Sequence, residues 1–201
     1  MAERAHPKEF KYFLKSKVFG LIPYYKINPY RKAVFWRYKI ARTFCNGKRV
    51  LDIPCGMGWG TSLLNNSKSI TGIDISEEAI NEAKNIYGSV ADFRVGDMAS
   101  INFDSNSFDT IVCLEGFEHV PEDVGDSFLI ECSRLVPPKG ILVLSTPYPV
   151  KGEHSGNPYH IKEYKPVEVR EKMIKNGFRV VKEKSKKVDN VIMTIFISEK
   201  E

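Results

Sequence analysis

The sequence lacks the features of several large classes of protein. No apolar run approaches the roughly 20 residues that a membrane-spanning helix needs. The first segment, MAERAHPKEFKYFLK, has no continuous apolar stretch, so we expect no secretory signal. The four cysteines form no CxxC pair, which predicts neither a zinc site nor a disulfide framework but small buried side chains in a cytoplasmic protein. They are Cys45, Cys55, Cys113 and Cys132.

Acidic residues are scarce at the start of the chain. Residues 1–49 hold two Asp or Glu against 13 Lys or Arg, a net charge of +11, and 11 of the 23 aromatic residues. The rest of the chain has 17 basic and 23 acidic side chains, a net of −6. We therefore predict a basic, aromatic arm over residues 1–47, which can contact an anionic membrane surface or a nucleic acid, and a globular domain over residues 48–201.

Strand and helix patterns alternate through the globular domain. Short apolar, β-branched runs that end at turns indicate buried strands. Helical segments lie between them, one with Ser76 as its N-cap and Gly88 as its stop. This alternation predicts an α/β fold with a mostly parallel sheet, helices on both faces and an antiparallel hairpin at the C-terminal edge. The expected strands are 49–54, 69–75, 91–97, 108–115, 141–147, 178–188 and 191–198, and the expected helices are 59–66, 77–87, 121–135 and 166–176. Helical patterns also occur in the arm, at 8–19 and 29–44. The alternative to an external partner is that 29–44 is a helix that covers the ligand site, with its lysines in solvent.

A glycine-rich stretch, VLDIPCGMGWGT at residues 50–61, follows the first of these strands. It reads GxGxG, whereas dinucleotide sites read GxGxxG, and the G-K-S/T of a P-loop is absent. A carboxylate beside the loop would also repel a pyrophosphate, by about 4 kcal/mol for a unit pair at ~4 Å and an effective dielectric of about 20. Acids end four neighbouring strands, where α/β sheets bind ligands, and they favour a ligand with a cationic head and a ribose. These acids are Asp52, Asp74, Asp97 and Glu115.

S-adenosylmethionine carries an ammonium, a sulfonium, a ribose and an adenine, and the sequence resembles the class I S-adenosylmethionine-dependent methyltransferases over residues 48–198. The resemblance is carried by VLDIPCGMGWGT, GIDIS, VGDM, FDTIVCLEGFEHV and VPPKGILVLSTP, in the family's order. It implies a Rossmann-like, seven-stranded sheet. The family usually has glycine two places after the first acid, where this chain has Pro54. Because proline fixes φ near roughly −65°, we expect a locally different turn there.

The resemblance also implies which residues contact the cofactor. Trp59 is expected either in the core or as a lid over the ligand. The implied contacts are Asp52 near the methionine ammonium, Gly56 and Gly58 beside the methionine portion, Asp74 on the ribose, Ile75, Asp97 and Met98 around the adenine, and Glu115 and Gly116 near the sulfonium.

Histidines follow the fourth and fifth strands, where the methyl acceptor is expected. A hydroxyl acceptor needs a general base, and we predict His119 or His160 in this role, with Glu163 orienting His160. His154 lies in the same loop as His160. We identify no metal cluster in the sequence. The segment NPYHIKEY resembles a motif of family members that methylate small molecules or saccharides of cell-envelope glycans. The leading hypothesis is therefore O-methylation of a sugar or glycan intermediate.

Two other functions stay open at this point. The basic arm would suit an RNA methyltransferase, although the chain has no Asn-Pro-Pro-Tyr-type motif after the fourth strand. A non-catalytic S-adenosylmethionine-binding module is the other alternative. The sequence leaves open the acceptor, the methylated atom (oxygen, nitrogen or carbon) and the oligomeric state.

Overall fold

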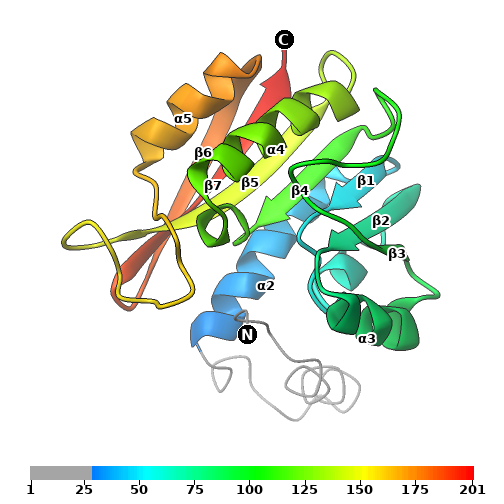
Figure 1. Ribbon diagram of the computed structural model, residues 1–201, viewed down its shortest axis with the longest axis horizontal. Helices are drawn as coiled ribbons and strands as arrows, with labels where there is room; N and C mark the ends of the chain where they lie inside the picture. The colour runs from blue at the N-terminus through cyan, green and yellow to red at the C-terminus, as the bar shows by residue number, and fades with distance from the viewer. Residues whose placement is uncertain (1–28) are drawn as a thin grey trace.

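The computed structural model of the protein describes residues 29–201, so the helical pattern expected at 8–19 lies outside the described residues. Seven strands alternate with four α-helices and three short 3-10 turns in this part of the chain (Figure 1). The strands are β1 (Arg49–Asp52), β2 (Ser69–Asp74), β3 (Asp92–Val95), β4 (Thr110–Leu114), β5 (Ile141–Pro149), β6 (Phe178–Val188) and β7 (Val191–Lys200). The helices are α2 (Pro29–Ala41), α3 (Glu77–Tyr87), α4 (Glu122–Leu135) and α5 (Pro166–Lys175), and the 3-10 turns are η2 (Arg42–Phe44), η3 (Thr61–Leu64) and η4 (Phe117–His119).

The strands form one sheet in the order β3-β2-β1-β4-β5-β7-β6. Strands β1 to β5 are parallel, and β7 runs antiparallel to both β5 and β6. This confirms the predicted Rossmann-like sheet with an antiparallel C-terminal hairpin. The strand order reverses between β1 and β4, and ligands bind beyond the carboxyl ends of the strands at such a point.

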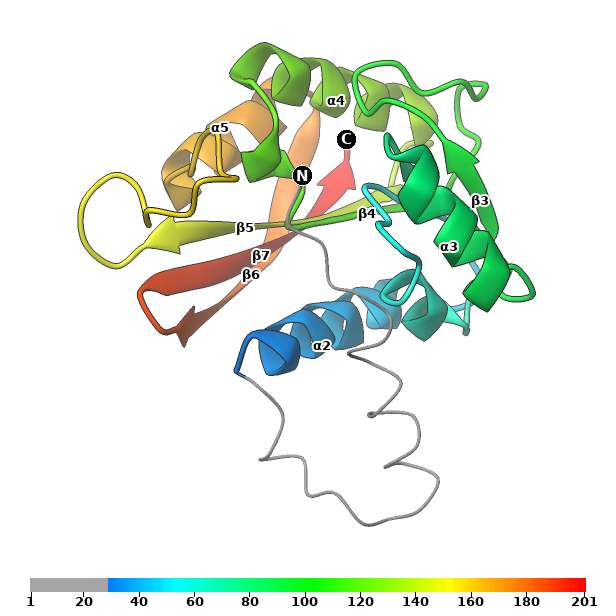
Figure 2. The same cartoon turned by 60° about the horizontal axis from the view of Figure 1, so that its bottom comes forward.

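Helices cover both faces of the sheet, as predicted. Figure 2 shows α4 and α5 on one face and α2 on the other. Adjacent strand residues point to opposite faces, and the two cores follow this rule. Leu51 packs in the core under α4 and α5, whereas its neighbour Val50 packs in the core with α2 and α3. Both faces of β1 are therefore buried, which explains why the parallel strands read as continuous apolar runs.

Local sequence signals set most helix boundaries. The Ser76 hydroxyl accepts a hydrogen bond from the Ala79 N–H at 3.3 Å, and α3 ends at Tyr87, immediately before Gly88. The helix expected at 59–66 is shorter, because only the 3-10 turn η3 forms. Ser62, within this segment, and Ser67, just after it, donate side-chain hydrogen bonds to backbone carbonyls at 2.6 and 2.7 Å. Such bonds compete with the backbone hydrogen bonds of an α-helix.

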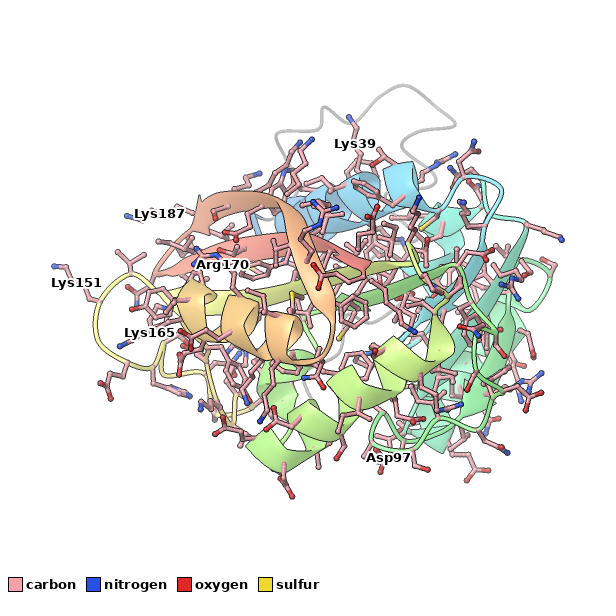
Figure 3. The ribbon with its side chains drawn as sticks, turned by 90° about the horizontal axis from the view of Figure 1, so that it is seen from above. Lys39, Asp97, Lys151, Lys165, Arg170 and Lys187 are labelled. Carbon is pink, nitrogen blue, oxygen red and sulfur yellow. The ribbon has the colours of Figure 1, made fainter. Side chains whose placement is uncertain are left out.

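The basic segment before β1 contains a helix that belongs to the folded body. Val34, Tyr38 and Ala41 of α2 are buried in the core on this face of the sheet. Exposed cations lie on its other side and on the outer strand β6, and Figure 3 shows Lys39 and Lys187 pointing outward. Within residues 29–201, no helix combines the length and apolar character needed to cross a bilayer. All four cysteines are buried and free, as the sequence predicted.

Candidate active site

A cavity of about 290 Å³ opens at the carboxyl ends of β1, β2 and β4. Its wall combines the glycine loop, the strand ends and one side of α2. Seven of the nine predicted cofactor contacts line it: Gly56, Asp74, Ile75, Asp97, Met98, Glu115 and Gly116. The structure therefore brings residues from four separate sequence motifs to one cavity, which we call the first cavity.

Asp74 fixes the glycine loop to the end of β2. Its side chain accepts hydrogen bonds from the Gly56 N–H at 2.8 Å and from the Ser76 N–H at 2.9 Å, and only 5% of the residue is exposed. A carboxylate has roughly four lone-pair sites, so acceptor capacity is left for a ligand's hydroxyl groups. Ile75 beside it is an exposed apolar side chain and can cover a flat ring.

The structure does not bring Asp52 and Gly58 to the wall of the first cavity. Asp52 is fully buried behind it and accepts hydrogen bonds from Thr61 Oγ1 at 2.6 Å and from the Tyr38 hydroxyl at 3.2 Å. Burial raises the pKa of Asp52 to about 7. Gly58 has a positive φ of 79°, and a Cβ there would lie 2.8 Å from the ring of Phe93. The structure thus gives both residues a role in packing the loop.

Helix α2 supplies wall residues that the sequence analysis missed. Val34, Arg37 and Tyr38 line the first cavity and lie three and four positions apart, so they share one side of the helix. The sequence analysis expected a helix over 29–44 to cover the ligand site, and the structure confirms this, but these three wall residues were not named although their helical spacing was a usable signal. Trp59 is buried and also lines the cavity, edge-on to Tyr38 at 6.5 Å between ring centroids. Gly60 lets Tyr38 approach, since a Cβ there would lie 2.0 Å from the tyrosine ring.

The end of β4 forms the part of the wall closest to α2. Glu115 Oε1 accepts a hydrogen bond from Ser145 Oγ at 2.8 Å and lies 3.6 Å from Nε of Arg37. Gly116 packs against Pro54, because a Cβ at position 116 would lie 2.2 Å from the proline ring. The proline that departs from the family pattern is thus matched by a glycine at the end of β4.

A second cavity of about 370 Å³ adjoins the first. Glu115 and His119 line both cavities. The remaining wall comes from η4, from β5 and the loop after it, and from β6, β7 and the turn between them, and it combines polar and apolar side chains. Its polar members include Ser155, Asn157, His160, Asp189 and Asn190.

Two histidines in this second cavity are held in defined orientations. His119 Nδ1 lies 2.8 Å from the carbonyl oxygen of Tyr159. A carbonyl only accepts, so Nδ1 donates and Nε2 keeps its lone pair. His160 Nδ1 bonds to the carboxylate of Glu163, and its Nε2 lies 2.9 Å from the side-chain nitrogen of Asn157. An amide N–H donates, so Nε2 of His160 also carries a lone pair. The centroids of the His119 and His160 rings are 5.0 Å apart.

Glu163 orients His160, which confirms the predicted contact. Burial would raise the pKa of Glu163, but hydrogen bonds from Ser155 and His160 outweigh it and hold the pKa below its usual range. Glu163 is therefore a carboxylate that accepts from both side chains. His154 does not line either cavity; its Nε2 lies 3.1 Å from the main-chain oxygen of His160.

Glu118 is a site residue that the sequence analysis did not single out. Its side chain is 1% exposed, and neither carboxylate oxygen has a hydrogen-bond partner within residues 29–201. Burial raises the pKa of Glu118 well above its usual value, and the nearby Glu115 raises it further. Ligand atoms of Glu118, His119 and His160 all lie within 4.8 Å of one another. His160 is far from Glu118 and His119 in the sequence, which explains why the sequence alone did not show this cluster.

Sequence comparison matches residues 50–140 to the family model described as a methyltransferase domain. The chain is 30% identical over 141 residues to a probable S-adenosylmethionine-dependent methyltransferase of Mycolicibacterium smegmatis, covering 68% of this chain and 54% of the relative. It is 33% identical over 128 residues to a ubiquinone biosynthesis O-methyltransferase of Coxiella burnetii, covering 62% and 52%. The chain therefore spans about half the length of these relatives.

Solved structures with the same fold include proteins with different descriptions. An S-adenosylmethionine-dependent methyltransferase of Methanosarcina mazei has a TM-score of 0.69 at 20% identity, covering 80% of this chain and 96% of that one. The PH0226 protein of Pyrococcus horikoshii has a TM-score of 0.71 at 20% identity, covering 92% and 99%. The cyclase SpnF has a TM-score of 0.72 at 16% identity, covering 81% and 79%. At these identities the likeness establishes the fold, and a shared fold does not fix the reaction.

Proposed function

The chain belongs to the class I S-adenosylmethionine-dependent methyltransferases, and we propose that it methylates a hydroxyl oxygen of a small molecule, foremost a sugar or a cell-envelope glycan intermediate. One observation carries this proposal. The first cavity, which fits the family's cofactor, meets the second cavity at Glu115 and His119. His119 and His160 both line the second cavity, where a hydroxyl would have to lose its proton.

The residues of the first cavity fit S-adenosylmethionine. Among the described residues, three acids, Asp74, Asp97 and Glu115, and one cation, Arg37, which lies 3.6 Å from Glu115, line it. This charge suits a ligand with ammonium and sulfonium groups and disfavours a phosphate. We propose that Asp74 holds the ribose hydroxyls, that Ile75 and Met98 contact the adenine and that Glu115 lies on the sulfonium side. When bound, S-adenosylmethionine supplies a methyl group on a positively charged sulfur that a nucleophilic oxygen can take.

The chain's own contribution is to align the acceptor, exclude water and handle the hydroxyl proton. His119 and His160 line the second cavity, and Tyr159 and Glu163 hold their Nδ1 atoms. The Asn157 amide, which bonds to Nε2 of His160, would have to be displaced before that atom could accept a proton. Neutral imidazole is a suitable group for accepting a hydroxyl proton. The fixed tautomers mean that the imidazole rings need little reorganisation when the acceptor binds.

The lining of the second cavity favours a polyhydroxylated acceptor. Side chains with both donor and acceptor groups, such as Ser155, Asn157 and Asn190, surround the space beside the histidines. Sugar hydroxyls need such partners, because a buried polar group without one is costly. A phenolic quinone precursor is the second candidate, since similar proteins are described as ubiquinone biosynthesis O-methyltransferases.

A methyl-transfer screen tests the proposal. Wild-type protein and radioactive S-adenosylmethionine would be incubated with nucleotide sugars, lipid-linked glycans, quinone precursors and RNA. The Asp74→Ala variant would serve as the cofactor-binding control. Label in a sugar fraction that depends on Asp74 supports the proposal, whereas label only in RNA supports the RNA methyltransferase alternative. Cofactor binding without label in any fraction would favour a non-catalytic module.

A further inference from the structure

We propose that Glu118, His119 and His160 bind a divalent transition-metal cation where the two cavities meet, and that this cation holds the acceptor hydroxyl. The three side chains come from η4 and from the loop after β5. Their ligand atoms lie within 4.8 Å of one another, a spacing that a single cation can bridge with small side-chain movements.

The state of Glu118 requires an explanation that the cofactor cavity does not provide. The carboxylate is 1% exposed, lies in the wall of the second cavity and has no hydrogen-bond partner in the described part of the chain. An unpaired buried polar group is costly, and buried carboxylates are normally paired or coordinate a metal. The Arg37 charge attracts Glu118, but its guanidinium lies 3.6 Å from Glu115 and makes no hydrogen bond to Glu118. A cation beside Glu118 would supply the missing partner.

Both histidines already have the hydrogen bonds typical of metal ligands. A ligating imidazole usually donates its other ring N–H to a carboxylate or a backbone carbonyl, which fixes its tautomer. His160 does so to the buried carboxylate of Glu163, and His119 does so to the carbonyl of Tyr159. Nε2 of His119 lies 4.0 Å from Oε1 of Glu118, so this atom is placed to bind a cation beside the carboxyl group. The amide of Asn157, 2.9 Å from Nε2 of His160, would give way to the cation.

The donor set indicates the class of metal. Two imidazoles and one carboxylate suit first-row transition metals, including zinc, whereas magnesium and calcium prefer all-oxygen sites. Three protein ligands also leave coordination positions open for oxygens of an acceptor. Ser155 and Asp189 also line the second cavity and offer hydrogen-bonding groups to such an acceptor.

The role of this cation rests on the proposed O-methylation. A hydroxyl bound to a divalent cation loses its proton more easily, just as metal-bound water does. The proton leaves to solvent, the oxygen forms a bond to the methyl carbon, and the carbon–sulfur bond breaks with its electron pair remaining on sulfur. With the cation bound, the histidines would hold the cation and would not accept the proton themselves.

Metal binding can be measured without any acceptor. Chelator-treated wild-type protein would be titrated with Mn²⁺ by electron paramagnetic resonance and with Zn²⁺ and Co²⁺ by calorimetry. We expect one cation per chain and a loss of affinity of at least about tenfold in Glu118→Gln and His160→Ala, since even outer-shell changes cost 10- to 100-fold. His154→Ala, in the same loop but outside the cluster, is the matched control and should bind like wild type.

Thermal unfolding supplies a second readout that also checks folding. Metal-free Glu118→Gln should be about as stable as metal-free wild type, because it replaces a buried carboxyl group that has no hydrogen-bond partner with an amide of nearly the same shape. The cation should then raise Tm of the wild type and not that of the variant. Absence of binding by all three metals, or unchanged binding in both variants, would overturn the site.

The two proposals fail in different ways. Methyl transfer to a hydroxyl that persists unchanged after metal removal, with no cation bound, overturns the metal site and leaves the proposed function intact. Suppose instead that a cation binds in a way that depends on Glu118 and His160, but no hydroxyl is methylated. This result supports the metal site and overturns the proposed function.

Discussion

Nε of Arg37 lies 3.6 Å from Oε1 of Glu115, and this contact joins helix α2 to the end of β4 beside both cavities. The Arg37 side chain is 2% exposed and that of Glu115 14%. Removal of one partner of a buried pair leaves the other charge uncompensated. The ion pair therefore links the fold of the basic segment directly to the cofactor wall.

Replacement of Arg37 by methionine should destabilise the protein. Breaking a buried pair costs about 3–5 kcal/mol, and the slight exposure of Glu115 places the expected loss in the free energy of unfolding at the lower end. Denaturant unfolding measures this loss, with Lys39→Met, an exposed change on the same helix, as the control. The double variant Arg37→Met/Glu115→Gln should recover part of the stability. If Arg37→Met is as stable as the control Lys39→Met, the ion pair does not contribute to stability.

Asp74→Ala should weaken S-adenosylmethionine binding by at least about tenfold, because charge-assisted hydrogen bonds contribute roughly 1.5–3 kcal/mol each. In the wild type, Asp74 accepts a hydrogen bond from the Gly56 N–H at 2.8 Å. The variant loses this bond, which loosens the glycine loop. Calorimetric titration gives the affinity. Asp92→Ala removes an exposed acid of β3 that lies outside the cavity, and it should bind the cofactor normally. Wild-type affinity in Asp74→Ala would contradict the ribose assignment.

Asp52 should make stability depend on pH. Burial raises the pKa of Asp52 to about 7, whereas an unfolded chain titrates such a group near roughly 3.9. Between these values the folded protein retains a proton that the unfolded chain has released, so this group lowers stability as pH rises and has no further effect above the folded pKa. For Asp52→Asn, the difference in Tm, variant minus wild type, should therefore become more positive from about pH 4 to about pH 8.

The matched control for this pH dependence is Asp109→Asn. Hydrogen bonds from Arg49 lower the pKa of Asp109, so its stabilising contribution is lost only at more acidic pH. Its difference in Tm from wild type should stay nearly constant over the same window. Melting would be followed by circular dichroism without cofactor. An Asp52→Asn difference that does not change with pH would place the titration elsewhere.

His119→Ala and His160→Ala should lower turnover while leaving cofactor binding intact. A positioned acid–base group contributes about 10²- to 10⁴-fold to the rate. Glu163→Gln should cause a smaller loss, because it weakens the hydrogen bond that orients His160. Turnover of an identified acceptor and calorimetry of S-adenosylmethionine binding are the paired measurements, and His154→Ala is the control. Normal turnover in both alanine variants would favour an acceptor that needs alignment alone.

Two truncations separate the roles of the N-terminal segment. Loss of residues 1–28 should preserve cofactor binding, because α2 remains to form the wall of the first cavity. Loss of residues 1–44 should abolish it, since Val34, Arg37 and Tyr38 line that cavity. Binding to anionic liposomes and to RNA, measured in both variants, tests the proposed role of the basic arm. Unchanged liposome and RNA binding in the shorter truncation would leave that role without support.

The sequence by itself determined the fold class, the helix ends and most of the first cavity. Strand ends, caps and a glycine loop are local features: Ser76 bonds to a residue three positions away, and acids that end parallel strands necessarily share one edge of the sheet. Seven of nine predicted cofactor contacts line one cavity for that reason.

Only the tertiary structure decided three features that depend on contacts between distant segments. Side-chain packing placed Asp52 behind Tyr38 and decided which residues of α2 line the cavity. The path of the loop after β5 brought His160 to His119 and Glu118. Local pattern carries no information on such distances, because they are set by how the loop and the helices pack on the sheet. The cluster proposed to hold a cation was therefore visible only after the chain had folded.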